Sequence, residues 1–199
     1  MKTASLALLA ILALAALDVA AADQAPLIQN NRVKVWDVAA GAPAPATSRD
    51  VVTFVIRGNA ASAQGTAFYR AKGAAPQPLP ADARAIVIEL QDSTVPPLAN
   101  TSGYPLAFPR PGSRKLLEND RVVVWSFTWT AGVATPMHFH DKDVVVTYLA
   151  DGALTSTDPQ GKSTINEHHF GFTKFNARDR VHTELLARGQ GSAMMVELK

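Results

Sequence analysis

The stretch PMHFHDKDVVVTYLADG, at residues 136–152, places two histidines one residue apart. Residues i and i+2 of an extended segment point to the same side, so His138 and His140 can direct both rings at one point. Two neutral imidazoles that converge on one face suit a divalent transition metal. A strand edge that carries histidines without a ligand is the alternative, because one His-x-His pair is by itself a weak signal.

Further candidate ligands follow this pair in the chain. His182, in the predicted strand RVHTELLA, could add a third nitrogen, and Asp143 could add an oxygen. Glu184 shares the strand face of His182, where it would either orient the imidazole ring or remain a solvated charge. His168 and His169 are adjacent and would point to opposite faces of a strand, so we expect surface or loop positions for both.

The elements that must position these residues are strands. In RVVVWSFTWT, residues 121–130, every second residue is large and apolar, which predicts a half-buried strand with an aromatic face. Four further segments continue the pattern: residues 144–150, 170–175, 180–187 and 193–198. No segment shows a convincing amphipathic helical period. Many short strands separated by turns predict an all-β chain folded as a sandwich or a barrel.

Two parts of the chain resemble each other. LIQNNRVKVW (27–36) aligns without gaps on LLENDRVVVW (116–125). Two shorter similarities follow in the same order, DVVTFVIRG with DVVVTYLADG and AIVIEL with AMMVEL. Three matches in one order indicate duplication of a strand-rich module. All five histidines lie in the second copy, which favours a functional role, because packing alone would place histidines in both copies.

The repeat and the composition divide the chain into four parts. Residues 1–22 carry a positive residue, an uncharged apolar run and small residues at the end, the pattern of a secretory signal peptide cleaved before Asp23. Residues 23–95 form a degenerate first module, 96–115 a proline-rich connector and 116–199 the module with the histidines. The leader predicts secretion, in a bacterium to the periplasm, with no membrane-spanning segment after cleavage.

Composition narrows the partners and the chemistry. The formal net charge is +2 and the positive residues are scattered, so no basic stripe indicates nucleic-acid binding. The chain has no cysteine, so its stability must come from packing and not from disulfides. No Gly-x-Ser-x-Gly elbow supports a serine hydrolase. The expected partner is a small-molecule ligand.

In these residues and their spacing, the second copy resembles a cupin. The first cupin motif reads Gly-x5-His-x-His-x3-4-Glu-x6-Gly, and Gly132, His138, His140 and Gly152 match its spacing. His182 falls where the second motif places its single histidine. The resemblance implies two jelly-roll β-barrel or sandwich modules in tandem, a bicupin whose first barrel is degenerate. A looser similarity links the chain to small cupins described as beta-alanine degradation proteins.

The chain also departs from the cupin pattern. The glutamate of the first motif should fall at Val144 or Val145, neither of which can bind a metal. Asp143 is the nearest carboxylate and shares strand parity with Val145, which makes it the candidate fourth ligand. In the second motif, the proline and glycine positions hold Ala177 and Asp179, and the final asparagine position holds Leu186.

The resemblance implies a divalent transition metal (Fe, Mn, Ni, Co or Zn) held by His138, His140 and His182, with Asp143 as a further ligand. It implies dioxygenase, isomerase or lyase chemistry on a small polar molecule. The alternative is a non-catalytic binding or structural bicupin that has lost its metal site. Cupins often pair through their sheets, so a homodimer is also an expectation.

Overall fold

The computed structural model describes residues 24–58, 63–76 and 78–199, and within them the chain is built of antiparallel strands with no helix. The all-β prediction is therefore confirmed. The proposed signal peptide at residues 1–22 lies outside the described residues. In those residues, no helix is long and apolar enough to cross a membrane.

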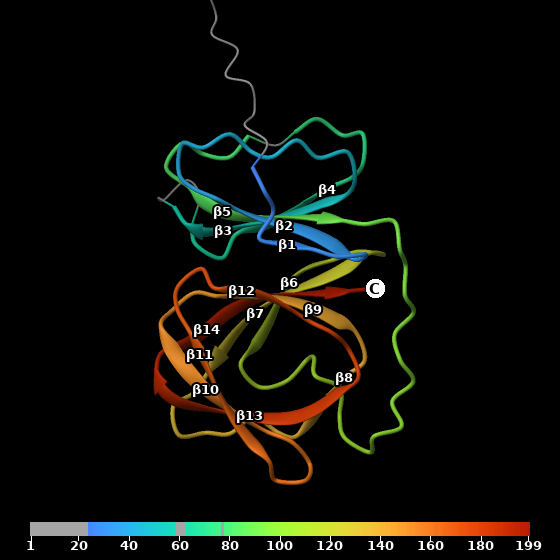
Figure 1. Ribbon diagram of the computed structural model, residues 1–199, viewed down its shortest axis with the longest axis vertical. Helices are drawn as coiled ribbons and strands as arrows, with labels where there is room; N and C mark the ends of the chain where they lie inside the picture. The colour runs from blue at the N-terminus through green and yellow to red at the C-terminus, as the bar shows by residue number, and fades with distance from the viewer. Residues whose placement is uncertain (1–23, 59–62, 77) are drawn as a thin grey trace, which may run out of the picture.

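The N-terminal part forms one five-stranded sheet, drawn at the top of Figure 1. Its strand order is β1-β2-β5-β3-β4. The strands are β1 (Ile28–Gln29), β2 (Val33–Val38), β3 (Val51–Arg57), β4 (Ala67–Arg70) and β5 (Arg84–Leu90).

The C-terminal part forms two sheets that face each other below it, a five-stranded sheet ordered β12-β9-β14-β7-β6 and a four-stranded sheet ordered β11-β10-β13-β8 (Figure 1). The strands of the first are β6 (Ser113–Glu118), β7 (Val122–Trp129), β9 (Asp143–Tyr148), β12 (Thr173–Asn176) and β14 (Gly191–Leu198). Those of the second are β8 (His138–His140), β10 (Gly152–Thr157), β11 (Ser163–His168) and β13 (Arg180–Gly189).

The internal repeat is visible in the strand order. Read from the opposite edge, the C-terminal five-stranded sheet runs β6-β7-β14-β9-β12, which matches β1-β2-β5-β3-β4 strand for strand. The turns agree as well. Asn30 Oδ1 accepts the backbone N–H of Arg32 at 2.8 Å, and Asn119 Oδ1 accepts that of Arg121 at 2.8 Å.

The first copy differs from the tandem of barrels that the resemblance implied. Between β3 and β5 its described residues contain only β4, whereas the second copy has β10–β13 between β9 and β14. The first copy therefore has no counterpart of the four-stranded sheet in the described residues. It forms a single layer, which must cover its apolar face with another part of the chain.

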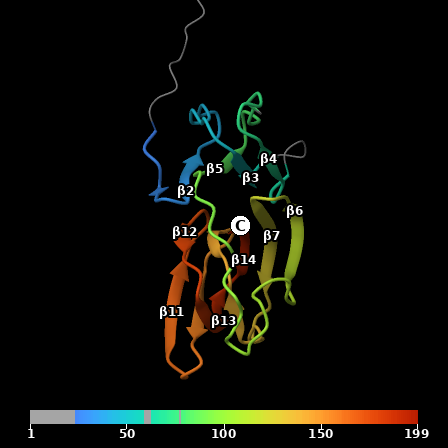
Figure 2. The ribbon, with the colours of Figure 1, turned by 90° about the vertical axis from the view of Figure 1, so that its right-hand side faces the viewer.

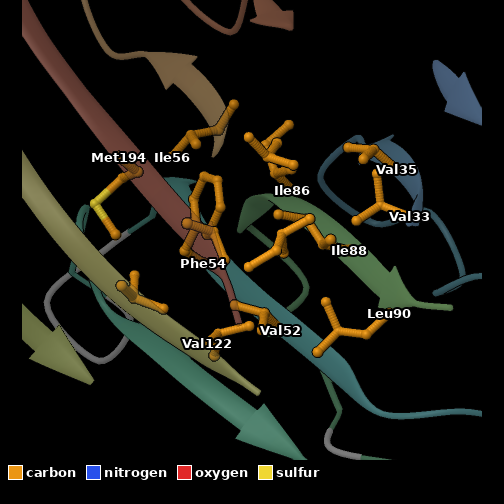
Figure 3. Packing of buried hydrophobic residues seen from close by; sticks show 14 residues of the cluster. Val33, Val35, Val52, Phe54, Ile56, Ile86, Ile88, Leu90, Val122 and Met194 are labelled. Atoms are coloured by element: carbon orange, nitrogen blue, oxygen red, sulfur yellow. The ribbon is translucent and has the colours of Figure 1, made fainter. Parts of the chain in front are cut away.

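That cover is the C-terminal five-stranded sheet, because apolar side chains of both sheets form one core. Figure 2 shows β2, β5, β3 and β4 lying directly above β12, β14, β7 and β6. Figure 3 shows Phe54, Ile86 and Ile88 from the first sheet beside Val122 and Met194 from the second, and each of these side chains is fully buried. The face of β7 that the sequence predicted to be partly exposed is thus covered at Val122 and Val124. At the central strands β9 and β14, both faces of this sheet are consequently buried.

A second core fills the C-terminal barrel. The alternate residues of β7 that were predicted to form an aromatic face lie in it, together with apolar side chains of β9 and β14. These aromatic residues are Trp125, Phe127 and Trp129. Phe127 and Trp129 pack edge to face with ring centroids 4.6 Å apart. This face of the sheet looks into the barrel, toward the four-stranded sheet.

The proline-rich connector links the N-terminal sheet to the C-terminal barrel and also lies along the barrel. Ala107 N donates to Phe139 O at 2.8 Å, and Phe139 N donates to Pro105 O at 2.9 Å, so the segment pairs with β8. This pairing buries Phe108 and Arg110 against the barrel core. The connector therefore contributes side chains to the interior.

Two arginine–aspartate pairs cross between the sheets at equivalent positions of the repeat. Arg32 Nε lies 3.2 Å from Asp143 Oδ2, and Arg121 Nη1 lies 2.8 Å from Asp50 Oδ2. Each arginine follows the first turn of its own copy. Asp50 immediately precedes β3, and Asp143 is the first residue of β9, the strand that corresponds to β3 in the order of the other sheet. The two pairs are reciprocal: the arginine of each copy contacts the aspartate of the other, as in an interface with two-fold symmetry.

We expect Asp143→Ala to lower the free energy of unfolding by about 3 kcal/mol, because it leaves a buried guanidinium unpaired. The side chains of Arg32 and Asp143 are only 5% and 10% exposed. Replacing both together, Arg32→Met with Asp143→Leu, should cost less than Asp143→Ala alone. Urea denaturation followed by tryptophan fluorescence measures both.

Asp50→Ala is the matched control. Its partner Arg121 is 25% exposed and can turn toward water, so the loss should be smaller. Equal losses for the two aspartates, or a double variant less stable than Asp143→Ala, would contradict this account.

Candidate metal centre

The three predicted histidines come from two paired strands of the four-stranded sheet. In the register of β8 and β13, His182 lies opposite His138, and Arg180 lies opposite His140. His138 and His140 are two residues apart and therefore share a face. Asp179, at the glycine position of the second motif, adopts the left-handed conformation with φ 66°, which aspartate tolerates. Its N–H donates to His140 O at 2.8 Å, which fixes the start of β13 against β8.

The structure brings the three rings together inside the barrel. The ring centroids of His138 and His182 are 4.7 Å apart, and each lies 5.1 Å from that of His140. Each ring offers a nitrogen within 4.8 Å of one on the other two. His140 Nε2 lies 3.3 Å from His182 Nε2. Three imidazoles at these separations can hold one transition-metal ion.

The protonation states suit a metal. His138 Nδ1 lies 2.7 Å from Pro136 O, and since a carbonyl only accepts, Nδ1 carries the proton and Nε2 keeps its lone pair. His138 Nε2 is buried and has no hydrogen-bond partner among the described residues. Burial, with Arg110 nearby, lowers the pKa of His138 to about 3, and burial with Arg180 and Arg110 nearby lowers that of His182 to about 3.

Burial also holds the pKa of His140 well below its usual value. All three rings are therefore neutral near pH 7, which is the form that binds metals. A buried nitrogen lone pair without a partner is what a metal ion would satisfy. The donor set consequently fits the ion that the resemblance implies.

Asp143, the predicted fourth ligand, lies apart from the histidines. Along β9, Val144 and Val146 line the barrel interior, whereas Val145 packs between the two five-stranded sheets. Asp143 shares the side of Val145, because side chains alternate along a strand. Its carboxylate pairs with Arg32 and accepts the N–H of Arg178 at 2.9 Å.

The sequence itself indicated that Asp143 need not be a metal ligand. Asp50 occupies the equivalent place in the first copy, which has no histidine, so an aspartate there did not depend on a metal site. The aspartate is present in both copies because in each it pairs with an arginine of the other copy.

A different carboxylate lies beside the cluster. Glu184 Oε1 is 3.9 Å from His182 Nε2. Glu184 Oε2 accepts hydrogen bonds from Arg110 Nη2 at 3.1 Å and from Trp129 Nε1 at 3.1 Å. The sequence placed Glu184 on the face of His182 but could not choose between a partner of the ring and a solvated charge. The structure places it inside the barrel, with one oxygen anchored.

His140 and His182 line a cavity of about 310 Å³ between the two C-terminal sheets, and His138 lies beside them in the cluster. The cavity wall includes three cationic side chains that no sequence motif indicated: Arg110, Lys174 and Arg180. Arg110 comes from the connector, and its guanidinium carbon lies 4.4 Å from the centroid of the Phe127 ring. The volume is at the lower limit of ordinary small-molecule pockets.

The two remaining histidines do not behave alike. His169 is exposed, as expected. His168 is 6% exposed and stacks on Tyr148, with ring centroids 4.1 Å apart and planes at 16°. The expectation of a surface or loop position was therefore wrong for His168, whose strand β11 turns that residue toward the barrel.

The two positions at which the cupin motif would place its glutamate, Val144 and Val145, allow a direct comparison of variants. Both are buried, but Val144 lines the cavity, whereas Val145 packs between the two five-stranded sheets. Val144→Glu should fold and bind Zn²⁺ about tenfold more tightly, since it adds a carboxylate near the imidazoles. Val145→Glu should lose most of its stability, because it buries a charge without a partner. Calorimetric Zn²⁺ titration and urea denaturation measure the two effects, and similar behaviour of both variants would contradict this assignment of faces.

Comparison with known proteins bears on the fold. No family model matches the chain, and no curated protein matches it. A cupin 2 conserved barrel domain protein from Leptotrichia buccalis is similar over 87% of this chain and 87% of its own, at 13% identity and a TM-score of 0.51.

Two further solved structures cover about half of the chain. A cupin domain from Bordetella pertussis is 24% identical over 46% of this chain and 97% of its own, with a TM-score of 0.41. A polyketide cyclase from Streptomyces resistomycificus is 22% identical over 53% of this chain and 80% of its own, with a TM-score of 0.36. The longer match, to the conserved barrel protein, shows that this chain has a cupin fold.

Proposed function

We propose that this protein is a metal-dependent enzyme that acts on a small polar molecule inside the C-terminal barrel. One observation carries the proposal: three neutral imidazoles, two of them buried and the third 13% exposed, converge beside a cavity large enough for such a molecule. His138, His140 and His182 would hold iron, manganese, nickel, cobalt or zinc. Iron, manganese, cobalt and nickel also tolerate the further ligands that a substrate would add.

A bound ion of this kind supplies a Lewis acid with an open coordination position. The protein's own residues supply the rest. Glu184 Oε1 faces the cluster and is available to accept or return a proton, while Arg110 and Trp129 hold Oε2 and so fix the orientation of the carboxylate. Apolar residues such as Val144 and Val146 keep water away from one wall.

These features support dioxygenase, isomerase or lyase chemistry. A second candidate is a binding protein without turnover. The observation that favours it is Val144, which lines the cavity where the cupin motif would offer a carboxylate. The two candidates agree on the site and differ in whether bound molecules are converted.

We also propose that the protein acts after export. The support is the apolar leader at residues 1–22, followed by a chain that contains no cysteine. A chain stabilised by packing alone folds independently of the redox state of its compartment.

The test is elemental analysis of the mature protein, residues 23–199, purified from its export compartment without a metal-binding tag. We expect close to one transition-metal ion per chain. His138→Ala, His140→Ala and His182→Ala should each weaken metal binding by more than about 100-fold, because each removes a direct ligand. His169→Ala, an exposed histidine outside the cluster, is the matched control.

Retention of metal in the three cluster variants would refute the site. The identified metal then selects the screen, and conversion of any compound that is lost in His140→Ala would favour the enzyme over the binding protein.

A further inference from the structure

The cavity beside the histidines has an excess of positive charge. Its lining contains Arg110, Lys174 and Arg180 but a single carboxylate, Glu184. Arg110 and Glu184 form an ion pair at 3.1 Å, with side chains only 4% and 14% exposed. That pair accounts for the carboxylate, so two cationic side chains remain without a counter-charge in the wall.

Arg180 is the more constrained of these two. Its Nε donates to Ala177 O at 2.6 Å, which holds the guanidinium in place. Its Nη2 is buried and has no hydrogen-bond partner among the described residues. A buried donor of a charged group without an acceptor is costly, so the arrangement is suited to an acceptor brought by a ligand.

Lys174 lies on the opposite wall of the cavity. It is carried by β12, opposite Val146 of β9, and its Nζ lies 5.7 Å from the centroid of the Tyr148 ring. It forms no ion pair within 4.0 Å among the described residues. Lys174 and Arg180 thus come from the two different sheets that enclose the cavity.

The position of Arg180 links this charge to the histidines. Arg180 and His182 are two residues apart on β13, so their side chains share a face, and both line the cavity. A group bound to Arg180 would consequently lie next to the histidine cluster. The cavity volume of about 310 Å³ corresponds to about ten water molecules, which restricts the ligand to a small compound.

We propose that the cavity binds a small organic carboxylate, with the carboxylate group between Arg180 and Lys174 and the remainder of the molecule beside the histidines. The apolar wall formed by Val146, Leu154 and Met195 favours an organic anion over inorganic phosphate, which has no apolar part to cover it. This inference names the substrate class of the proposed metal site and rests on the same cavity.

The test is calorimetric titration of metal-free protein with butyrate, butyramide and inorganic phosphate. Removing the metal ensures that the carboxylate is not measured as a metal ligand. We expect butyrate to bind at least tenfold more tightly than butyramide, its neutral counterpart of similar shape. Equal binding of these two compounds, or tighter binding of phosphate than of butyrate, would overturn the proposal.

Variants then locate the binding group. Arg180→Gln and Lys174→Gln should each weaken butyrate binding about tenfold, and Arg180→Lys should restore part of the loss, since it retains the charge. Arg188→Gln is the matched control, because Arg188 lies on the same strand, is 59% exposed and pairs with Glu167 on the surface. Unchanged butyrate binding in both Arg180→Gln and Lys174→Gln would overturn the proposal. If Arg180→Gln does not fold, butyrate binding by Lys174→Gln alone provides the test.

Zn²⁺ titration of the same variants separates this inference from the proposed function. Arg180→Gln and Lys174→Gln should still bind Zn²⁺, since neither side chain is a proposed ligand. Butyrate binding without Zn²⁺ binding by the unmodified chain would refute the metal site and retain the carboxylate site. Zn²⁺ binding without butyrate binding would refute the carboxylate site and retain the metal site.

Discussion

The structure depends on the face-to-face packing of two five-stranded sheets, one from each copy of the repeat. Each sheet contributes apolar side chains to a shared core, and those that meet there, among them Phe54, Ile86 and Met194, are fully excluded from water. Full burial of one such side chain stabilises a fold by roughly 1.5–3 kcal/mol. Because the N-terminal sheet covers the outside of the barrel wall, the inner face of that wall is free to line a cavity.

Successive side chains of β9 point to opposite faces of this wall, and the two faces have different roles. Val144 and Val146 face the cavity, while Asp143 and Val145 face the other copy. A shift of one residue in register would exchange the two sets and place a carboxylate near the histidines at the expense of the core. The contact between the copies therefore constrains which residues the site can use.

Period-two patterning was sufficient to predict the all-β fold. The three matching segments indicated a duplicated module, and the two five-stranded sheets have the same strand order. The spacing of His138 and His140, together with the cupin resemblance that supported His182 as the third ligand, predicted which rings converge. Asp143 was misplaced because strand parity says which residues share a face, but not which face looks inward. The single-layered first copy was missed because a repeat of three short segments does not report the strands between them. Arg110 lies in a proline-rich segment with no periodic signal, and the missing partner of Arg180 Nη2 is visible only in three dimensions.

The paired Arg32–Asp143 and Arg121–Asp50 contacts describe an assembly that two separate chains would form by association, here joined in one polypeptide. A covalent link replaces a bimolecular equilibrium with an intramolecular one, so dilution does not separate the halves. The two halves also differ: the first forms a single sheet that covers the barrel, while the second encloses the cavity and carries the imidazoles. Two identical subunits in a symmetric dimer would instead each carry the same site.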